Sequence, residues 1–551
     1  MPAGAWPPPR KLARCWGFTP LPRLESRLSK SELARNREAM LPLLEQMHGL
    51  QAQVLQGGGA KAQQRMKERG KMLPRERVEA LLDPKTPFLE LSSLAANGMY
   101  QDESPGASVV AGIGTVCGRT CMIIASDASV KGGAIYPMTL KKHLRAQRIA
   151  EENRLLCFNL VESAGANLLY QAELFAETGG RVFANQARMS ARGIPQIALV
   201  FGSSTAGGAY MPGMSDYVVM VRNQARVFLG GPPLVKMATG EVIDEESLGG
   251  AEMHASVSGV SDYTAEDDLH ALQIGRQIVA SLPCAQATLK QGRRPRFDPQ
   301  ELLGVIPADA RQPLEIREVL ARLLDDSEFL EFKADYGSTL VCGHARLGGF
   351  QVGILANNGV LFSESANKGA QFIQLCNQAR IPILFVQNIT GFMVGSQVER
   401  EGIVKHGSKL VNAVSTSNVP HLTLIVGGSY GAGNYGMCGR AYDPRFLFTW
   451  PNSRIAVMGG EQAAGVMSLL AEEQARSRGQ QPDSAAIEAR AQATRAMFEK
   501  ESSAFYATAR LWDDGILDPR DTRQALIQAL AAVHHSPFLE SQAPHYGVFR
   551  M

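Results

Sequence analysis

Four Gly-rich turns are the parts of the sequence best suited to chemistry. Two lie in the first half, at 163–166 (Ser-Ala-Gly-Ala) and 204–209 (Ser-Thr-Ala-Gly-Gly-Ala), and two in the second, at 390–391 (Thr-Gly) and 429–434 (Ser-Tyr-Gly-Ala-Gly-Asn). Each follows an apolar segment. Small residues let a ligand approach the backbone, and a helix that begins there presents free N–H groups and a dipole that favours negative charge. Paired turns therefore predict an oxyanion hole suited to a thioester enolate, although any single turn could serve backbone packing alone.

Side chains that could act as nucleophile, base or metal ligand are hard to find. Residues 427–431 match GxSxG, the nucleophile elbow of serine hydrolases, but the later histidines are confined to the polar C-terminus and the equivalent turn at 202–206 lacks the last Gly. Eight scattered cysteines show no CxxC pair, which favours buried reduced thiols over a metal site. No phosphate-binding P-loop and no HExxH motif occur. We therefore expect no metal and no hydrolase triad.

One basic segment is a candidate for binding phosphate. Residues 136–148 are predicted to form a helix that carries Lys141, Lys142 and Arg145. Its charges could hold the phosphates of coenzyme A, or the helix could simply present a solvated face.

The two halves of the chain resemble each other, which indicates an internal duplication. Residues 194–202 align with 419–427, and the same offset pairs Gly208 with Gly433 and Tyr210 with Tyr435. Three further pairs of segments follow in the same order: 153–165 with 379–391, 122–127 with 352–358, and 259–262 (Gly-Val-Ser-Asp) with 515–518 (Gly-Ile-Leu-Asp). Because four matches share one order, chance is a poor explanation.

The elements that must position the turns are short apolar strands separated by helices, which predict buried, mostly parallel sheet. We expect an α/β fold of two duplicated lobes. The predicted divisions are a disordered or extended start at 1–28, an N-terminal domain at 29–284 that opens with a helical arm near 30–55, a linker at 285–311 and a C-terminal domain at 312–551. A length of 551 residues suits several domains. The net charge of +3 gives no reason to expect nucleic acid, and no apolar run is long enough to cross a membrane.

Taken together, these residues resemble the carboxyltransferase components of biotin-dependent acyl-CoA carboxylases. The resemblance runs from about residue 32 to the C-terminus and is carried by the strings at 131–137 (KGGAIYP), 207–210 (GGAY), 228–233 (FLGGPP), 238–241 (ATGE), 357–362 (NNGVLF) and 428–436 (GSYGAGNYG). It implies two crotonase-like lobes. It also implies that carboxybiotin, carried on a separate subunit, delivers CO2 to an acyl-CoA carbanion.

The resemblance further implies partners. A biotin carboxylase and biotin carrier α subunit would use ATP and bicarbonate, since this chain shows neither an ATP-binding segment nor a biotinyl-lysine motif (235–237, Val-Lys-Met, is a poor match). The β chains would form a β6 core of an α6β6 complex, with each active site between the N-lobe of one subunit and the C-lobe of another. A bacterial cytoplasmic location is expected, with the mitochondrial matrix as the alternative.

By the same resemblance, backbone amides do the catalytic work. The residues implied for the thioester enolate are Ala164 and Gly165, with Gly207 and Gly208. Those implied for the biotin ureido oxygen are Gly431, Ala432 and Gly433, with Gly391 and Phe362 nearby. The family's first turn usually reads Ser-Gly-Gly-Ala, whereas Ala164 stands second here.

The acyl group is expected to be a branched enoyl chain. The strings are most similar to those of the 3-methylcrotonyl-CoA and geranyl-CoA carboxylases, with Phe183 and Tyr210 in the acyl region. Methylcrotonyl enzymes typically carry Phe where Gly179 stands in this sequence. Losing that ring would free space for the longer geranyl chain, at about 0.8 kcal/mol for each buried CH2, although Gly179 could instead only ease a turn. We therefore favour geranyl-CoA and keep methylcrotonyl-CoA as the alternative.

Two other classes remain open. A crotonase-like hydratase or decarboxylase would need a carboxylate beside a Gly turn, for which Glu162 is the near candidate; the second lobe has Asn388 there. A non-catalytic scaffold would tolerate bulky residues in the turns, and the sequence has none.

Overall fold

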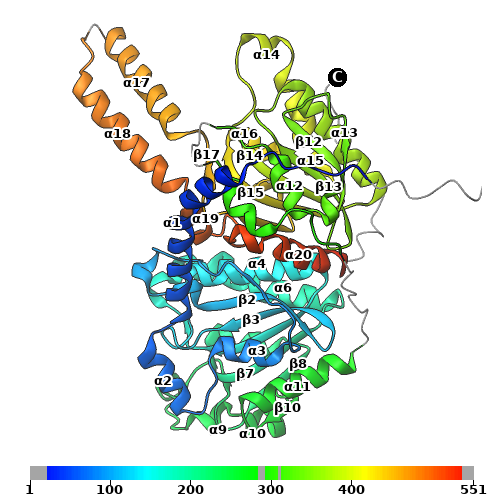
Figure 1. Cartoon of the computed structure of the whole chain (residues 1–551). Helices are drawn as coiled ribbons and strands as arrows, with labels where there is room; N and C mark the ends of the chain where they lie inside the picture. The colour runs from blue at the N-terminus through cyan, green and yellow to red at the C-terminus, as the bar shows by residue number, and fades with distance from the viewer. Residues whose placement is uncertain (1–20, 283–291, 308–311, 479, 536–551) are drawn as a thin grey trace, which may run out of the picture.

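The structure is a computed structural model that describes residues 21–282, 292–307, 312–478 and 480–535. It contains two α/β lobes, each built on one sheet (Figure 1). The N-lobe elements are α1 (Lys30–Leu55), α2 (Ala60–Glu68), α3 (Pro74–Leu81), β1 (Leu89–Leu91), β2 (Val109–Val116), β3 (Arg119–Ser126), β4 (Ala134–Ile135), α4 (Pro137–Asn153), β5 (Leu156–Ser163), β6 (Gly165–Ala166), α5 (Gln171–Leu174), the π-turn η4 (Phe175–Gly179), α6 (Gly180–Ala191), β7 (Gln196–Thr205), the 3-10 turn η5 (Ala206–Ala209), α7 (Tyr210–Gly213), β8 (Tyr217–Val221), β9 (Arg226–Phe228), α8 (Pro232–Thr239), α9 (Glu245–Gly249), α10 (Ala251–Met253), β10 (Tyr263–Ala265) and α11 (Asp268–Ser281).

The C-lobe repeats the plan with α12 (Ile316–Leu323), β11 (Phe329–Phe332), β12 (Leu340–Leu347), β13 (Phe350–Asn357), α13 (Ser363–Ala379), β14 (Ile383–Ile389), α14 (Ser396–Arg400), α15 (Ile403–Thr416), β15 (His421–Tyr430), α16 (Gly431–Gly436), β16 (Phe446–Thr449), β17 (Arg454–Ala456), α17 (Gly460–Ser477), α18 (Ser484–Glu501), α19 (Ala504–Ala509) and α20 (Thr522–His535). Helices α17 and α18 form a hairpin that projects from the body of the lobe (Figure 1).

The sheet orders confirm the duplication. The N-lobe sheet runs β1-β2-β3-β5-β7-β8-β10 and the C-lobe sheet β11-β12-β13-β14-β15-β16, with β9 and β17 paired to the extended ends of β7 and β15. The first three strands of each sheet are antiparallel and the later strands parallel. Because the interior strands are buried on both faces, their sequences are almost continuously apolar. The predicted α/β fold of two lobes is therefore confirmed.

One of the predicted correspondences is wrong by four residues. The amide of Asp262 donates to the carbonyl of Val218, and its carboxylate accepts the Val218 amide. In the C-lobe Asp514 makes the same two bonds to Leu447, so the equivalent of Asp262 is Asp514. The sequence match to residue 518 was wrong because a Gly-x-x-Asp pattern shared by two segments does not reveal which backbone groups the aspartate bonds.

The N-terminal arm and the predicted linker both pack against the lobes. Helix α1 begins at a capping box in which Ser29 and Glu32 bond each other's backbone amides. Its apolar face buries Met40, Leu44 and Met47. Within the predicted linker, residues 292–307 are described, and Leu302 lies fully buried. The predicted extended start is described from residue 21, and residues 1–20 lie outside the described part of the chain.

Asp514 is the polar centre of the contact between the lobes. Its carboxylate pairs with Arg145 of α4 at 2.7 and 2.8 Å and with Arg440 of the C-lobe at 2.8 Å, while it also caps β16. Although burial by itself raises the pKa of Asp514, the two guanidiniums hold that pKa below its usual value. Helices α4 and α20 lie between the two sheets around this site (Figure 1).

We predict that Asp514→Asn lowers the free energy of unfolding by about 3 kcal/mol, because it leaves two arginines without a counter-charge in a buried site. The matched control is Asp443→Asn, which breaks the exposed Arg148–Asp443 ion pair between the same lobes and should lower that free energy by less than about 1 kcal/mol. Urea unfolding followed by circular dichroism measures both. Equal losses would contradict the role given to Asp514.

Candidate active site

The two N-lobe turns meet at the ends of β5 and β7. Gly165 adopts a φ of 92°, a conformation that favours glycine, and forms the short strand β6 beside β4. The turn η5 follows β7 directly. An ideal Cβ on Gly165 would lie 3.6 Å from the carbonyl oxygen of Thr205, so the structure brings the two predicted turns together.

The amides predicted for the N-lobe hole differ in availability. Ala164 donates its N–H to the carbonyl of Gly132 at 2.9 Å, and Gly165 donates to the Ser163 hydroxyl at 3.1 Å. Both amides are therefore engaged within the turn, because the 131–133 loop lies against it. Gly207, in the first turn of η5, has no acceptor within that helix. The N–H groups that remain available to a ligand here are therefore those of Gly207 and its neighbour Gly208, rather than those of Ala164 and Gly165.

The two C-lobe turns make an equally close pair. Gly391 has a φ of 126° and Gly431 a φ of 54°. The amides of Gly431, Ala432 and Gly433 are the first three of α16, so they have no intrahelical acceptor. An ideal Cβ on Gly433 would lie 2.5 Å from Cγ1 of Ile389 and 3.1 Å from Cα of Gly391. Because Ile389 and Gly391 lie so close, only glycine fits at position 433.

Phe362 is adjacent to the C-lobe turns, as predicted. Its neighbour Leu361 donates its amide to the Gly391 carbonyl at 3.1 Å and forms a parallel bridge with Phe392. Phe362 itself is the residue before α13. It therefore reaches the same edge of the lobe as α16.

Three of the predicted acyl-site residues surround one apolar cluster. Leu140, Leu174 and Val182 are its buried members, and Phe183 and Met211 pack against it. The rings of Phe183 and Tyr210 meet edge to face, with centroids 5.9 Å apart, and a Cβ on Gly179 would lie 3.9 Å from Leu140. Near this cluster in the sequence, three apolar side chains are exposed: Leu168 (79% exposed), Leu169 (88%) and Phe175 (83%).

Gly179 has a backbone reason to be glycine that the sequence did not reveal. It ends the π-turn η4, and an ideal Cβ there would lie 2.7 Å from the carbonyl oxygen of Leu174. A side chain at 179 therefore requires the turn to rearrange. The local backbone therefore explains the glycine independently of any role in an acyl site.

The basic helix was misinterpreted as a phosphate site. Lys142 is buried, and its ammonium donates to the carbonyls of Gly106 and Val109, while burial lowers the pKa of Lys142 to about 8. The guanidinium of Arg145 forms an ion pair with the carboxylate of Asp514. Lys141 is exposed, but its ammonium donates to the Arg510 carbonyl. The charges of α4 hold the lobes and strands together because that helix lies between them, a location that sequence spacing cannot show.

A cavity that contains two arginines lies beside the first Gly turn. It has a volume of about 550 Å³ and is lined by Arg65 of α2, by Arg69 directly after that helix, by Lys131 and Gly132, and by the acidic Asp102 and Glu103, the second of which pairs with Lys131. Gly132 accepts the Ala164 amide, so the cavity opens next to the N-lobe turn. Only the fold places these side chains beside the turn.

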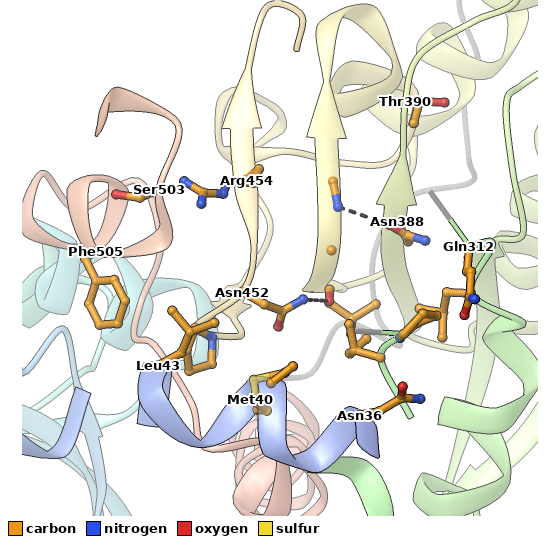
Figure 2. Close-up of a pocket in the computed structure, with 18 of the residues that line it drawn as sticks. Asn36, Met40, Leu43, Gln312, Asn388, Thr390, Asn452, Arg454, Ser503 and Phe505 are labelled. Carbon is orange, nitrogen blue, oxygen red and sulfur yellow. Dashed lines mark hydrogen bonds between the residues drawn. The ribbon is translucent and has the colours of Figure 1, made fainter. Parts of the chain in front are cut away.

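A second cavity, of about 600 Å³, lies beside the C-lobe turns. Figure 2 shows it between α1, which supplies Met40 and Leu43, and the ends of β14 and β15. Asn388 accepts the amide of Gly428 there. In the N-lobe the equivalent space is filled, because Glu162 replaces Asn388 and pairs with Lys71 at 2.5 Å and Arg77 at 2.9 Å.

These contacts remove two alternative functions. Glu162 is neutralised by Lys71 and Arg77, and it packs against β7 where an ideal Cβ on Gly202 would lie 2.5 Å from it. It is therefore a structural ion pair and no catalytic acid or base. Ser429 of the GxSxG string is fully buried and donates to Gln387 at 2.6 Å, so it is no hydrolase nucleophile. Among the described residues no His/Cys/Asp/Glu group suited to a metal occurs, and no described helix is long and apolar enough to span a membrane.

Comparison with known proteins agrees with this geometry. The family model for the carboxyl transferase domain matches residues 65–549. The chain belongs to the carboxyl transferase family. It is a carboxyltransferase (β) subunit of the biotin-dependent acyl-CoA carboxylase type, with two crotonase-like lobes.

Relatives of this carboxyltransferase align over nearly their whole length. A biotin-dependent 3-methylcrotonyl-CoA carboxylase beta1 subunit of Mycobacterium tuberculosis is 55% identical over 92% of this chain and 97% of its own. A probable mitochondrial methylcrotonoyl-CoA carboxylase beta chain of Drosophila melanogaster is 52% identical over 95% and 93%. The crystal structure of the geranyl-CoA carboxylase beta subunit of P. aeruginosa superposes with a TM-score of 0.87 at 49% identity, over 96% of this chain and 99% of that one.

We predict that Gly433→Ala lowers the kcat of this carboxyltransferase by about 100-fold, as expected when an oxyanion-type donor is displaced. The new methyl group has no room beside Ile389 and Gly391, so α16 must move. Gly465→Ala in α17, where a Cβ meets nothing within 4 Å, is the control and should retain full activity. Steady-state carboxylation assays decide, and equal activity of both variants would refute the packing argument.

Proposed function

We propose that this chain transfers CO2 from carboxybiotin on a partner subunit to the γ-methyl carbon of a branched enoyl-CoA. The observation that carries the proposal is that each lobe has two Gly turns at equivalent places, where the candidate carboxylate Glu162 is held by Lys71 and Arg77 and the candidate nucleophile Ser429 is buried against Gln387. Carboxybiotin enters as a substrate and supplies the CO2. The chain's own residues supply position and hydrogen bonds.

Each pair of turns suits one reactant. The amides of residues 431–433 are neutral donors with no intrahelical acceptor, which fits a ureido oxygen that gains negative charge as CO2 leaves. Gly207 and Gly208 fit the thioester oxygen, whose charge grows as the dienolate forms. Preorganised N–H groups stabilise such charge without a proton transfer of their own. The proton of the γ-methyl group is left to the second substrate.

The cavity beside the N-lobe turn suits the anionic end of coenzyme A. Arg65 and Arg69 line it, while Gly132 joins it to the thioester turn. Guanidinium groups bind phosphate oxygens with charge-assisted hydrogen bonds. This assignment replaces the earlier one to α4.

The cluster around Gly179 favours geranyl-CoA. Met211 of α7 packs on its buried members, and Leu168, Leu169 and Phe175, close by in the sequence, are exposed apolar side chains. A chain five carbons longer than methylcrotonyl could cover that surface, gaining about 0.8 kcal/mol per buried CH2. Methylcrotonyl-CoA is the second candidate, supported by the 55% identity to a subunit whose name specifies that substrate.

The chain is proposed to work with a biotin carboxylase and biotin carrier α subunit, as a β6 core of an α6β6 complex. Among the described residues no hydrogen bond or ion pair joins the N-lobe turns to the C-lobe turns. An active site that needs both is then completed by two copies of the chain. The exposed apolar side chains on the α17–α18 hairpin, Leu469 (67% exposed) and Leu470 (55%), suit burial in such an assembly.

We predict a higher kcat/KM for geranyl-CoA than for methylcrotonyl-CoA when the chain acts with its biotin-loaded partner, ATP and bicarbonate. Gly179→Phe should shift the ratio at least about ten-fold toward the shorter substrate, the equivalent of 1.4 kcal/mol. Because a Cβ on Gly180 meets nothing within 4 Å, Gly180→Phe is the neighbouring control for a general effect on η4. Preference of the unmodified enzyme for methylcrotonyl-CoA would reject the geranyl assignment.

We also predict that the double variant Arg65→Ala, Arg69→Ala raises the KM for acyl-CoA about ten-fold, since each lost charge-assisted hydrogen bond contributes roughly 1 kcal/mol or more. The kcat should stay near that of the unmodified enzyme because neither side chain reaches the reacting atoms. Lys67→Ala on the same helix is the control, since Lys67 pairs with Glu76 outside the cavity. An unchanged KM in the double variant would place the CoA phosphates elsewhere.

A further inference from the structure

We propose that Gln387, Ser429 and Asn434 are positioning residues for the biotin half of the reaction. They form a chain of hydrogen bonds, here called the C-lobe relay, that sets the direction of the α16 amides. The proposal rests on the proposed function, in which those amides receive the ureido oxygen of biotin.

The C-lobe relay connects three elements in one line. The Asn434 side-chain amide, on α16, donates to the Ser429 hydroxyl at 2.7 Å. Ser429, on β15, donates in turn to Oε1 of Gln387 at 2.6 Å. Gln387, on β14, returns to the helix by donating Nε2 to the carbonyl of Met437 at 2.7 Å. The middle of α16, at Asn434, and the residue after its end, Met437, are thus both tied to β14 and β15.

The relay is buried and its bonds are complementary. Gln387 and Ser429 are fully buried, so a mismatch there leaves a polar group without water. In this arrangement the Ser429 hydroxyl acts once as donor and once as acceptor, and the Gln387 amide uses both of its ends. A buried polar network that is fully satisfied fixes a single geometry.

Helix α16 needs such a constraint. It has six residues, too few to be stable without tertiary contacts. Its amides at 431–433 must nevertheless point at one small oxygen, and productive sites hold their donors to within about 0.5 Å. Packing of Gly433 on Ile389 and Gly391 fixes how close the helix lies. The relay fixes how it is rotated.

The N-lobe shows that the duplicated fold does not require the relay. Ser204 takes the same register position as Ser429, since Ser204 pairs with Ser163 and Ser429 with Ile389 in the bulged parts of their sheets. The residues equivalent to Gln387 and Asn434 are Val161 and Ala209. Ser204 instead donates to the Gly208 carbonyl. The relay is therefore a feature of the biotin lobe alone.

The test uses the full chain and measures transfer from the carboxylated acyl-CoA to free biotin. In this direction a carbon–carboxylate bond breaks, the carboxyl group joins N1′ of biotin, and the N1′ proton moves to the carbon. The variants are Ser429→Ala and Asn434→Ala, the second of which places the N-lobe residue in the helix and so should fold. Ser204→Ala is the matched variant in the other lobe. Thermal unfolding establishes that each variant is folded.

The relay predicts that Ser429→Ala and Asn434→Ala each raise the KM for free biotin about ten-fold, as misaimed donors should, while the KM for acyl-CoA changes less than about two-fold. Ser204→Ala should raise the KM for acyl-CoA and leave the KM for biotin unchanged. An unchanged biotin KM in folded Ser429→Ala and Asn434→Ala would overturn the relay and leave the proposed function standing. A reversed pattern, with biotin affected through Ser204 and acyl-CoA through Ser429, would overturn the assignment of the two half-sites itself.

Discussion

The buried carboxylate of Asp514 is the interaction on which the arrangement of the two lobes depends. It accepts the Leu447 amide of β16, while the Asp514 amide donates to the Leu447 carbonyl, and it meets one arginine from each lobe. Around it, α4 and α20 fill the space between the sheets, and the largest buried cluster takes residues from both lobes. A charge in such a place is stable only while its partners stay. The lobes are therefore held in one relation, and their Gly turns are presented in fixed directions.

Duplication then explains how two reactants are served by one backbone design. In each lobe, two neighbouring parallel strands end in glycine turns, and one of these turns begins a short helix. Divergence lies in the side chains behind the turns. The N-lobe fills the space behind its turn with the Glu162 ion pairs, whereas the C-lobe leaves a cavity beside Asn388. The C-lobe also replaces Val161 and Ala209 by a hydrogen-bonding glutamine and asparagine. Under the proposed function, the same fold thus offers an apolar neighbourhood for an acyl chain and a polar one for a ureido ring.

The proposed chemistry explains why few side chains are needed in the site. When one substrate accepts the proton and delivers the CO2, the protein needs only to orient two reactants and to stabilise two developing oxyanions. Backbone amides do this at positions where any side chain would block the approach. Under the proposed function, substrate choice then depends on the shape of the cluster around Gly179.

The sequence by itself determined the duplication, the α/β fold, the four turns and the family. Those features are present in local patterns: apolar strand segments, glycines at equivalent positions and similar strings that recur in the same order in both halves. Tertiary structure alone decided which charges are free. In the sequence, Lys142 and Arg145 look like a phosphate-binding face on a helix. In the structure both bond groups of the protein itself, because α4 lies between two sheets. It likewise decided that the Ala164 and Gly165 amides are engaged and that Asp514, not Asp518, closes the second sheet. The reason is physical: a residue's type fixes what it can bond, but the group that it bonds is brought to it by the fold, as with Arg145 and Asp514, 369 residues apart, and no local pattern records that contact.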